Sequence, residues 1–104
     1  MGKLEINNIM DGENPVGGSV KGMGIDIRWQ NCVLGRGNER KEQNGAFVED
    51  VIKAILSRLN FFQDSKFKCR ENSLAITKLE EALHWMNHRT QKREAAGTEG
   101  THNG

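Results

Sequence analysis

Apolar residues recur at helical intervals through the C-terminal half of the chain. Between positions 47 and 62 they follow an i, i+3, i+4 spacing, which places them on one face of an α-helix. The members of this stripe are Phe47, Val48, Val51, Ile52, Ile55, Leu56, Leu59 and Phe62. The spacing predicts a helix that begins near 44–45 and ends near 61–63.

A second apolar stripe predicts a second helix, from position 70 or 72 to about position 95. Gly97 follows it, and glycine commonly stands just past a helix end. The connector 63–68 is short, and we expect Phe67 within it to be buried. Two long amphipathic helices with a short loop predict an antiparallel helical hairpin. The members of the second stripe are Leu79, Ala82, Leu83 and Met86, joined near the start by Leu74 or Ala75 and by Ile76.

The first 44 residues show a different pattern, which is typical of strands and turns. In 23–34, the apolar residues Met23, Ile25, Ile27 and Trp29 alternate with other residues, which is the period of a half-buried strand. A weaker alternation predicts a strand over 3–7. The segment 11–22 is rich in glycine and contains a proline, so we expect turns there. We also expect a turn over 35–40 and a short returning strand over 39–42.

These patterns predict an α+β fold, in which a small N-terminal antiparallel β-sheet packs on a C-terminal antiparallel two-helix hairpin. We expect a single domain over 1–104, divided into strands and turns (1–44), the hairpin (45–97) and a polar tail (98–104) that alone would be disordered. The chain has 104 residues, of which 36% are hydrophobic. A monomer of this composition would have a thin core, so we expect a homo-oligomer.

Charge and cysteine content narrow the class of protein. A net charge of +1 argues against a protein that coats duplex DNA, but it leaves room for a local basic site for a small phosphate ligand. No stretch approaches the roughly 20 apolar residues of a membrane span, and we expect no signal peptide. Cys32 and Cys69 do not form a metal-type pair, and we expect buried free thiols. We therefore expect a soluble, intracellular protein.

Three residues spaced by four, Trp85, Arg89 and Arg93, would form one ridge on the second helix. Two guanidinium groups can bind phosphates and an indole offers a surface for a base, while Lys92 adds positive charge. The same spacing also fits a solvated helix face whose cations suit the helix dipole, with Trp85 in the core.

The histidines His84 and His88 are also spaced by four, and Glu81 precedes them. This set could chelate a metal, but it lacks the paired motifs of a di-iron bundle and the HExxH of a zincin. Satisfied or solvent-facing histidines are the better interpretation, and we expect neither a metal site nor a cofactor. The chain contains no GxSxG, Walker A loop or HxE…CxxC motif, so we expect no enzyme activity.

The predicted hairpin turn carries another candidate site, because Phe62 ends the first helix and Asn72 begins the second. Asn72 fits an N-cap, whose side-chain oxygen accepts from free backbone N–H groups. In the alternative interpretation, an aromatic face and an amide beside a helix N-terminus form a pocket for a nucleotide. The sequence pattern leaves both open.

Longer motifs carry a resemblance to a known family. The runs are NGAFVEDVI (44–52), CREN (69–72), AITKLEEALHWMNHRT (75–90) and KREAAGTEGTH (92–102). They closely resemble the first type of phage Thoeris anti-defence proteins, which share a helical hairpin domain with the second anti-CBASS protein. The resemblance covers 46–102 well and the N-terminal strands less fully.

The resemblance implies a phage-encoded, non-enzymatic protein that acts in the cytoplasm of the infected bacterial host. Members of the family bind cyclic ADP-ribose isomers made by immune TIR-domain enzymes and keep them from their effectors. Some also bind cyclic dinucleotides or cyclic trinucleotides at separate sites. Members have a small sheet with a helical hairpin and assemble as homodimers, in some cases as homohexamers.

The resemblance also assigns residues to two kinds of site. Phe62 and Asn72 would line the cyclic ADP-ribose pocket. We also expect Arg28 and Trp29 to contribute to this pocket, on the basis of their position on the predicted strand alone. For the cyclic oligonucleotide sites the resemblance implies Arg89 and Arg93, and we expect Trp85, Thr98 and Thr101 to contribute to the same sites. Ala96 stands where we expect arginine in many relatives, and we expect weaker cyclic dinucleotide affinity if that arginine contacts phosphates.

Other classes of protein stay open at this point. A small regulatory protein could bind nucleic acid through the basic residues of the second helix, Arg89, Lys92 and Arg93, and its binding would depend strongly on salt. A phosphodiesterase-like enzyme would degrade the signal, and a helical interaction module would dock on a host protein.

Overall fold

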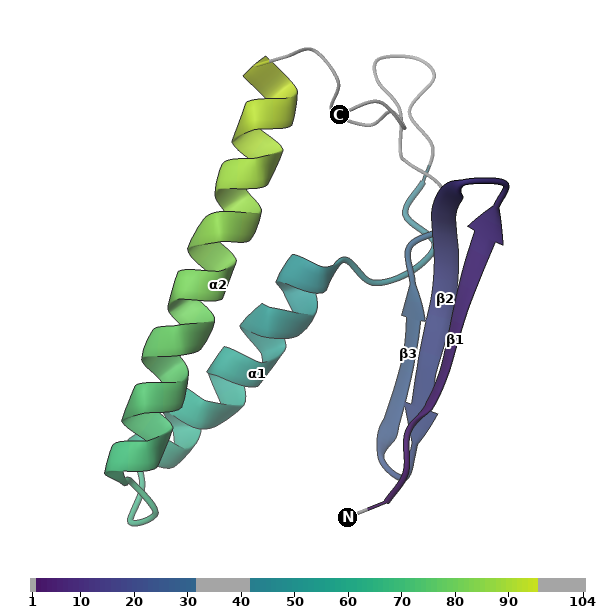
Figure 1. Cartoon of the computed structure of the whole chain (residues 1–104). Coiled ribbons are helices and arrows are strands. Elements are labelled where there is room, and N and C mark those ends of the chain that lie inside the picture. The colour runs from purple at the N-terminus through teal and green to yellow at the C-terminus, as the bar shows by residue number, and fades with distance from the viewer. Residues whose placement is uncertain (1, 32–41, 96–104) are drawn as a thin grey trace. The chain divides into compact units, whose positions relative to one another are not determined.

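The structure is a computed structural model, and it describes residues 2–31 and 42–95. The elements follow the order β1 (Glu5–Asp11), β2 (Asn14–Gly22), β3 (Ile25–Trp29), α1 (Val48–Gln63) and α2 (Arg70–Ala95). The α+β class with an N-terminal antiparallel sheet and a C-terminal helical hairpin is therefore confirmed (Figure 1). The chain divides into a sheet unit and a helical unit, Val48–Arg93, and each is described by itself.

The sheet unit is a three-stranded antiparallel meander in the order β1-β2-β3. Two-residue turns, Gly12–Glu13 and Met23–Gly24, join its strands. Gly24 has a φ of 79°, a left-handed conformation that glycine adopts without steric cost. Met23, predicted as part of a strand, lies in this turn and is 97% exposed. The predicted strand over 23–34 is confirmed at Ile25–Trp29, and the one over 3–7 runs instead from Glu5 to Asp11.

The central strand β2 lies where turns were predicted, so the prediction for 11–22 is confirmed at Gly12–Glu13 and wrong for Asn14–Gly22. A Cβ on Gly18 would collide with the backbone carbonyl of Asn7 on β1, so a glycine lets the two backbones approach closely. Pro15 lies beside a register shift between Ile9 and Met10, a place where the ladder tolerates a missing N–H. The glycine and the proline are therefore compatible with a paired strand at these positions.

The segment before α1 returns to the sheet and delays the start of the helix. Ala46 forms a parallel bridge with Trp29, in which Ala46 N donates to the Arg28 carbonyl (2.8 Å) and Gln30 N donates to the Ala46 carbonyl (3.0 Å). The backbone N–H of Asn31 donates to Asn44 Oδ1 at 2.8 Å. Because positions 44–46 make these contacts, α1 begins at Val48 and not at the predicted 44–45. The predicted turn over 35–40 lies outside the described residues, as does all but the last residue of the predicted strand over 39–42; that residue, position 42, is not in a strand.

The helical unit confirms both predicted helices but has a thin core. α1 and α2 lie side by side at the end where their connector joins them (Figure 1). Leu56, 9% exposed, is the only buried hydrophobic side chain among the described residues. Several predicted stripe positions are instead exposed, including Val48 (46%), Ile55 (44%) and Leu74 (50%). No helix in the described part of the chain is long and apolar enough to cross a membrane.

Candidate ligand-binding site

The hairpin turn links Phe62 to Asn72 through a short relay of hydrogen bonds. The Phe62 carbonyl accepts from the backbone N–H of Ser65 at 3.1 Å and from its hydroxyl at 2.6 Å. The same hydroxyl oxygen accepts from the backbone N–H of Phe67 at 3.1 Å. The Asn72 side-chain amide then donates to the Phe67 carbonyl at 3.4 Å. The turn thus brings the two predicted site residues to one end of the helical unit, and both are half-buried.

Asn72 does not cap α2, which corrects one of the two interpretations of this residue. The helix begins at Arg70, and the Sγ of Cys69 accepts from the backbone N–H of Asn72 at 3.4 Å, which is the contact of an N-cap. Gln63 Oε1 holds Cys69 from the other side, accepting from its backbone N–H at 2.9 Å. With the cap supplied by Cys69, the side chain of Asn72 turns back to the connector. None of the described residues donates to its amide oxygen.

Cysteine burial was predicted wrongly for Cys69, whose free thiol is exposed. Its position at the helix N-cap, in the connector, keeps it in contact with solvent. Cys32 lies outside the described residues.

Aromatic rings gather on the α1 side of the turn. The ring centroids of Phe61 and Phe62 lie 6.1 Å apart with a tilt of 46°. The guanidinium of Arg58 lies over both, 5.3 Å from the Phe61 centroid and 4.8 Å from that of Phe62. Arg58 was not predicted as a site residue, although its i, i+3 and i, i+4 spacing to two aromatic residues was a usable signal.

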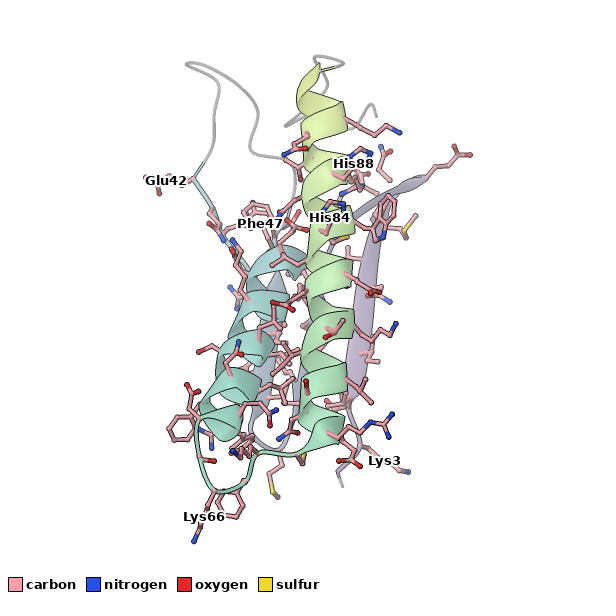
Figure 2. The ribbon with its side chains drawn as sticks, turned by 90° about the vertical axis from the view of Figure 1, so that its left-hand side faces the viewer. Lys3, Glu42, Phe47, Lys66, His84 and His88 are labelled. Carbon is pink, nitrogen blue, oxygen red and sulfur yellow. The ribbon has the colours of Figure 1, made fainter. Side chains whose placement is uncertain are left out.

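The connector presents its own cation on an aromatic ring. Phe67 is 64% exposed, so its predicted burial is wrong. The Lys66 ammonium lies 5.3 Å from the centroid of this ring, at the tip of the connector (Figure 2). The turn is short enough that its backbone bonds to itself, which leaves no room to fold the Phe67 ring beneath it. Positive charge and aromatic surface therefore occur together at this end of the hairpin.

The predicted ridge on α2 is exposed. Trp85 is 65% exposed, so the alternative that places it in the core is wrong. Its indole meets the rings of His84 and His88 edge-on, at centroid distances of 5.6 and 5.8 Å. Arg89 is also exposed, with neither a hydrogen bond nor an ion pair to another described residue. Arg93 lies in α2 with a side chain outside the described set, and Ala96, Thr98 and Thr101 lie outside the described residues altogether.

The histidines face solvent, which confirms the interpretation preferred from the sequence. His84 and His88 lie one turn apart on α2 and are exposed (Figure 2). Glu81, the third member of the candidate metal set, lies 3.7 Å from the ammonium of Lys78. The described residues include no group of three or more side chains that could hold a metal ion.

Arg28 and Trp29 lie next to each other on β3, within the sheet unit. The Arg28 side chain is exposed and Trp29 is half-buried. Trp29 pairs with Gly18 of β2, and Arg28 pairs with Ser19. Their contribution to a pocket with Phe62 stays a prediction.

Comparison with known proteins finds a family that matches the part of the chain containing most of the helical hairpin, and a similar phage protein. The chain matches the family described as Acb2/Tad1, hairpin domain, over residues 26–91, which is more than half of its length. It is 59% identical over 59 residues to a Bacillus phage SBSphiJ7 protein named Thoeris anti-defense 1. That match covers 57% of this chain and 42% of the relative, so the chain spans less than half the length of that protein. The matched range contains β3, α1, the hairpin turn and most of α2, and on this basis the chain belongs to the Acb2/Tad1 hairpin-domain family.

Proposed function

We propose that the chain counters Thoeris immunity by binding cyclic ADP-ribose isomers at the hairpin turn and withholding them from their effector. The observation that carries the proposal is the relay from Phe62 to Asn72, which holds an aromatic ring and an amide at one end of the hairpin. The related phage protein named Thoeris anti-defense 1 supports the anti-Thoeris role. In this proposal the protein holds the ligand without cleaving it.

The chemistry of the turn suits a compact phosphorylated nucleotide. A ring such as Phe62 offers apolar surface to an adenine base, and an amide oxygen such as that of Asn72 accepts from a ribose hydroxyl or an exocyclic amine. Sequestration needs a dissociation constant below the concentration that activates the effector. A value of 1 nM corresponds to about 12 kcal/mol, which demands that most of the ligand surface be enclosed.

A homo-oligomer would enclose the ligand more fully than one hairpin. In the helical unit Leu56 is the only buried side chain among those described, whereas Phe61 is 60% exposed and Leu74 is 50% exposed. Large apolar side chains left exposed in this way are suited to contact with a partner, and a second copy would cover them. We therefore propose a homodimer or a homohexamer.

The exposed ridge on α2 supports a second ligand class, cyclic dinucleotides or cyclic trinucleotides. Trp85 offers its indole to a base, and Arg89 has no counter-charge among the described residues. Arginine binds phosphate oxygens in bidentate fashion, so this residue suits a charged ring with several phosphates. Nucleic acid is the competing ligand, and it would reveal itself by a steep loss of affinity with salt.

The deciding experiment is calorimetric titration of the chain with cyclic ADP-ribose isomers, cyclic dinucleotides and cyclic trinucleotides. The complexes are then heat-denatured and the released ligand is examined by chromatography. Tight binding with intact ligand is expected, whereas cleaved ligand would indicate an enzyme and no binding to any member would refute the proposal.

Two variants and a matched control locate the site. Phe62→Ala and Asn72→Ala should each weaken binding of cyclic ADP-ribose isomers by about 10-fold or more, because each removes a direct contact. Asn87→Ala removes the same amide from an exposed position on α2, far from the turn, and should bind like the wild type. Normal affinity of Phe62→Ala would place the ligand elsewhere.

A further inference from the structure

Arg58 lies against two aromatic rings at the edge of the proposed site. Its guanidinium lies over both Phe61 and Phe62, at 5.3 and 4.8 Å from the ring centroids. Such contacts attract the cation to the ring faces and restrict a side chain that otherwise has many rotamers. The charge is thus positioned before any ligand arrives.

The same guanidinium has no counter-charge among the described residues. The ion pairs of the helical unit join Lys53 to Asp50 and Lys78 to Glu81, and neither includes Arg58. No described residue accepts a hydrogen bond from it. Guanidinium carries five N–H donors in its plane, and at Arg58 none of them bonds to a described residue. A planar donor edge of this kind matches two oxygens of a phosphate group.

We propose that Arg58 is a further ligand-binding residue, which donates from its guanidinium to the phosphates of the nucleotide held at the hairpin turn. This inference rests on the proposed function of the turn and names its phosphate-binding group. Phe62 contributes to both groups, because its ring contacts Arg58 and its backbone carbonyl begins the relay that reaches Asn72. The arrangement selects phosphorylated ligands over neutral nucleosides.

The test measures the affinity for cyclic ADP-ribose isomers at several salt concentrations. Arg58→Gln should weaken binding by about 10- to 100-fold and flatten its dependence on salt, because one cation–phosphate contact is lost. Arg58→Lys keeps the charge but loses the planar arrangement of N–H donors. Its affinity should therefore lie between those of the wild type and Arg58→Gln, and its dependence on salt should match that of the wild type. The matched control is Lys53→Gln, which removes the same charge from an exposed, ion-paired position on α1 and should behave as wild type.

The outcomes separate this inference from the proposed function. If the wild type binds and Arg58→Gln binds equally well, Arg58 is not a ligand residue although the site stands. A loss of affinity with an unchanged salt dependence also overturns the inference, because Arg58 would then only support the Phe62 ring. If the wild type binds no cyclic ADP-ribose isomer, the proposed function fails, and this assignment fails with it. Melting curves recorded for every variant show that each one is folded.

Discussion

Replacing Ser65 by alanine tests whether the relay organises the binding site. The hydroxyl donates to the Phe62 carbonyl at 2.6 Å and accepts from the Phe67 backbone at 3.1 Å, so Ser65→Ala removes two hydrogen bonds without removing any proposed ligand contact. A hydrogen bond contributes about 0.5–1.5 kcal/mol net. The Phe62 carbonyl keeps its bond from the Ser65 backbone N–H, and the Phe67 side is solvent-exposed. The loss should therefore lie near the lower end, about 1–2 kcal/mol in total.

That loss should appear in ligand affinity. If the relay holds Phe62 and Asn72 in their binding positions, loosening it makes the ligand supply the missing order, and affinity falls by roughly 5- to 30-fold. Calorimetric titration measures this change, and urea denaturation measures the accompanying loss in unfolding free energy. Ser57→Ala is the matched control, because Ser57 is exposed on α1 with no side-chain hydrogen bond to another described residue. A less stable Ser65→Ala variant with unchanged affinity would refute the idea that the relay organises the site.

Three further predictions concern the sheet, the helix cap and the ridge. Gly18→Ala should lower the unfolding free energy of the chain by at least about 2 kcal/mol in urea denaturation. The added Cβ would meet the Asn7 carbonyl, and residue 18 has a φ of 155°. A urea midpoint equal to that of the wild type would contradict the close approach of the β1 and β2 backbones. Cys69→Ala should destabilise α2 by about 0.5–1 kcal/mol while Cys69→Ser does not, because serine also accepts from the N-terminal N–H groups; equal melting temperatures would exclude the cap. Arg89→Ala combined with Arg93→Ala should abolish cyclic dinucleotide binding in calorimetry and leave cyclic ADP-ribose binding intact; unchanged dinucleotide affinity would remove the ridge from the proposal.

The helices were predictable because apolar residues that recur at helical spacing form one face, and that face is the one a helix buries. The stripe from Val51 to Phe62 is half-buried or buried at most positions, and α1 ends where the pattern ends. β2 was not predictable by the same reasoning, because its glycines and Pro15 are characteristic of turns. What places them in a strand is the close approach of β1 at Gly18, a tertiary contact that no local pattern contains.

Parts of the candidate site escaped the sequence for a similar reason. Asparagine is a preferred N-cap and cysteine is not, so the pattern favoured Asn72 over Cys69. The connector decides otherwise, because Gln63 accepts from the Cys69 backbone and fixes it before the first turn of α2. Because Cys69 supplies the cap, the Asn72 side chain does not. Its amide oxygen is then available to the ligand that we propose.

In the proposed function, the turn and the thin core have separate roles. Every contact that orients Phe62 and Asn72 is made within the connector and its flanking helix turns, so the site geometry depends on local hydrogen bonds. Burial contributes little there, because Leu56 alone is buried in the described helical unit. Stability must then come from surfaces outside one hairpin, which is the role we propose for a second copy. Ligand specificity would be set by the short turn, and stability would be set by assembly. The two properties can then change independently, because mutations of exposed apolar positions such as Leu74 leave the hydrogen bonds of the relay intact.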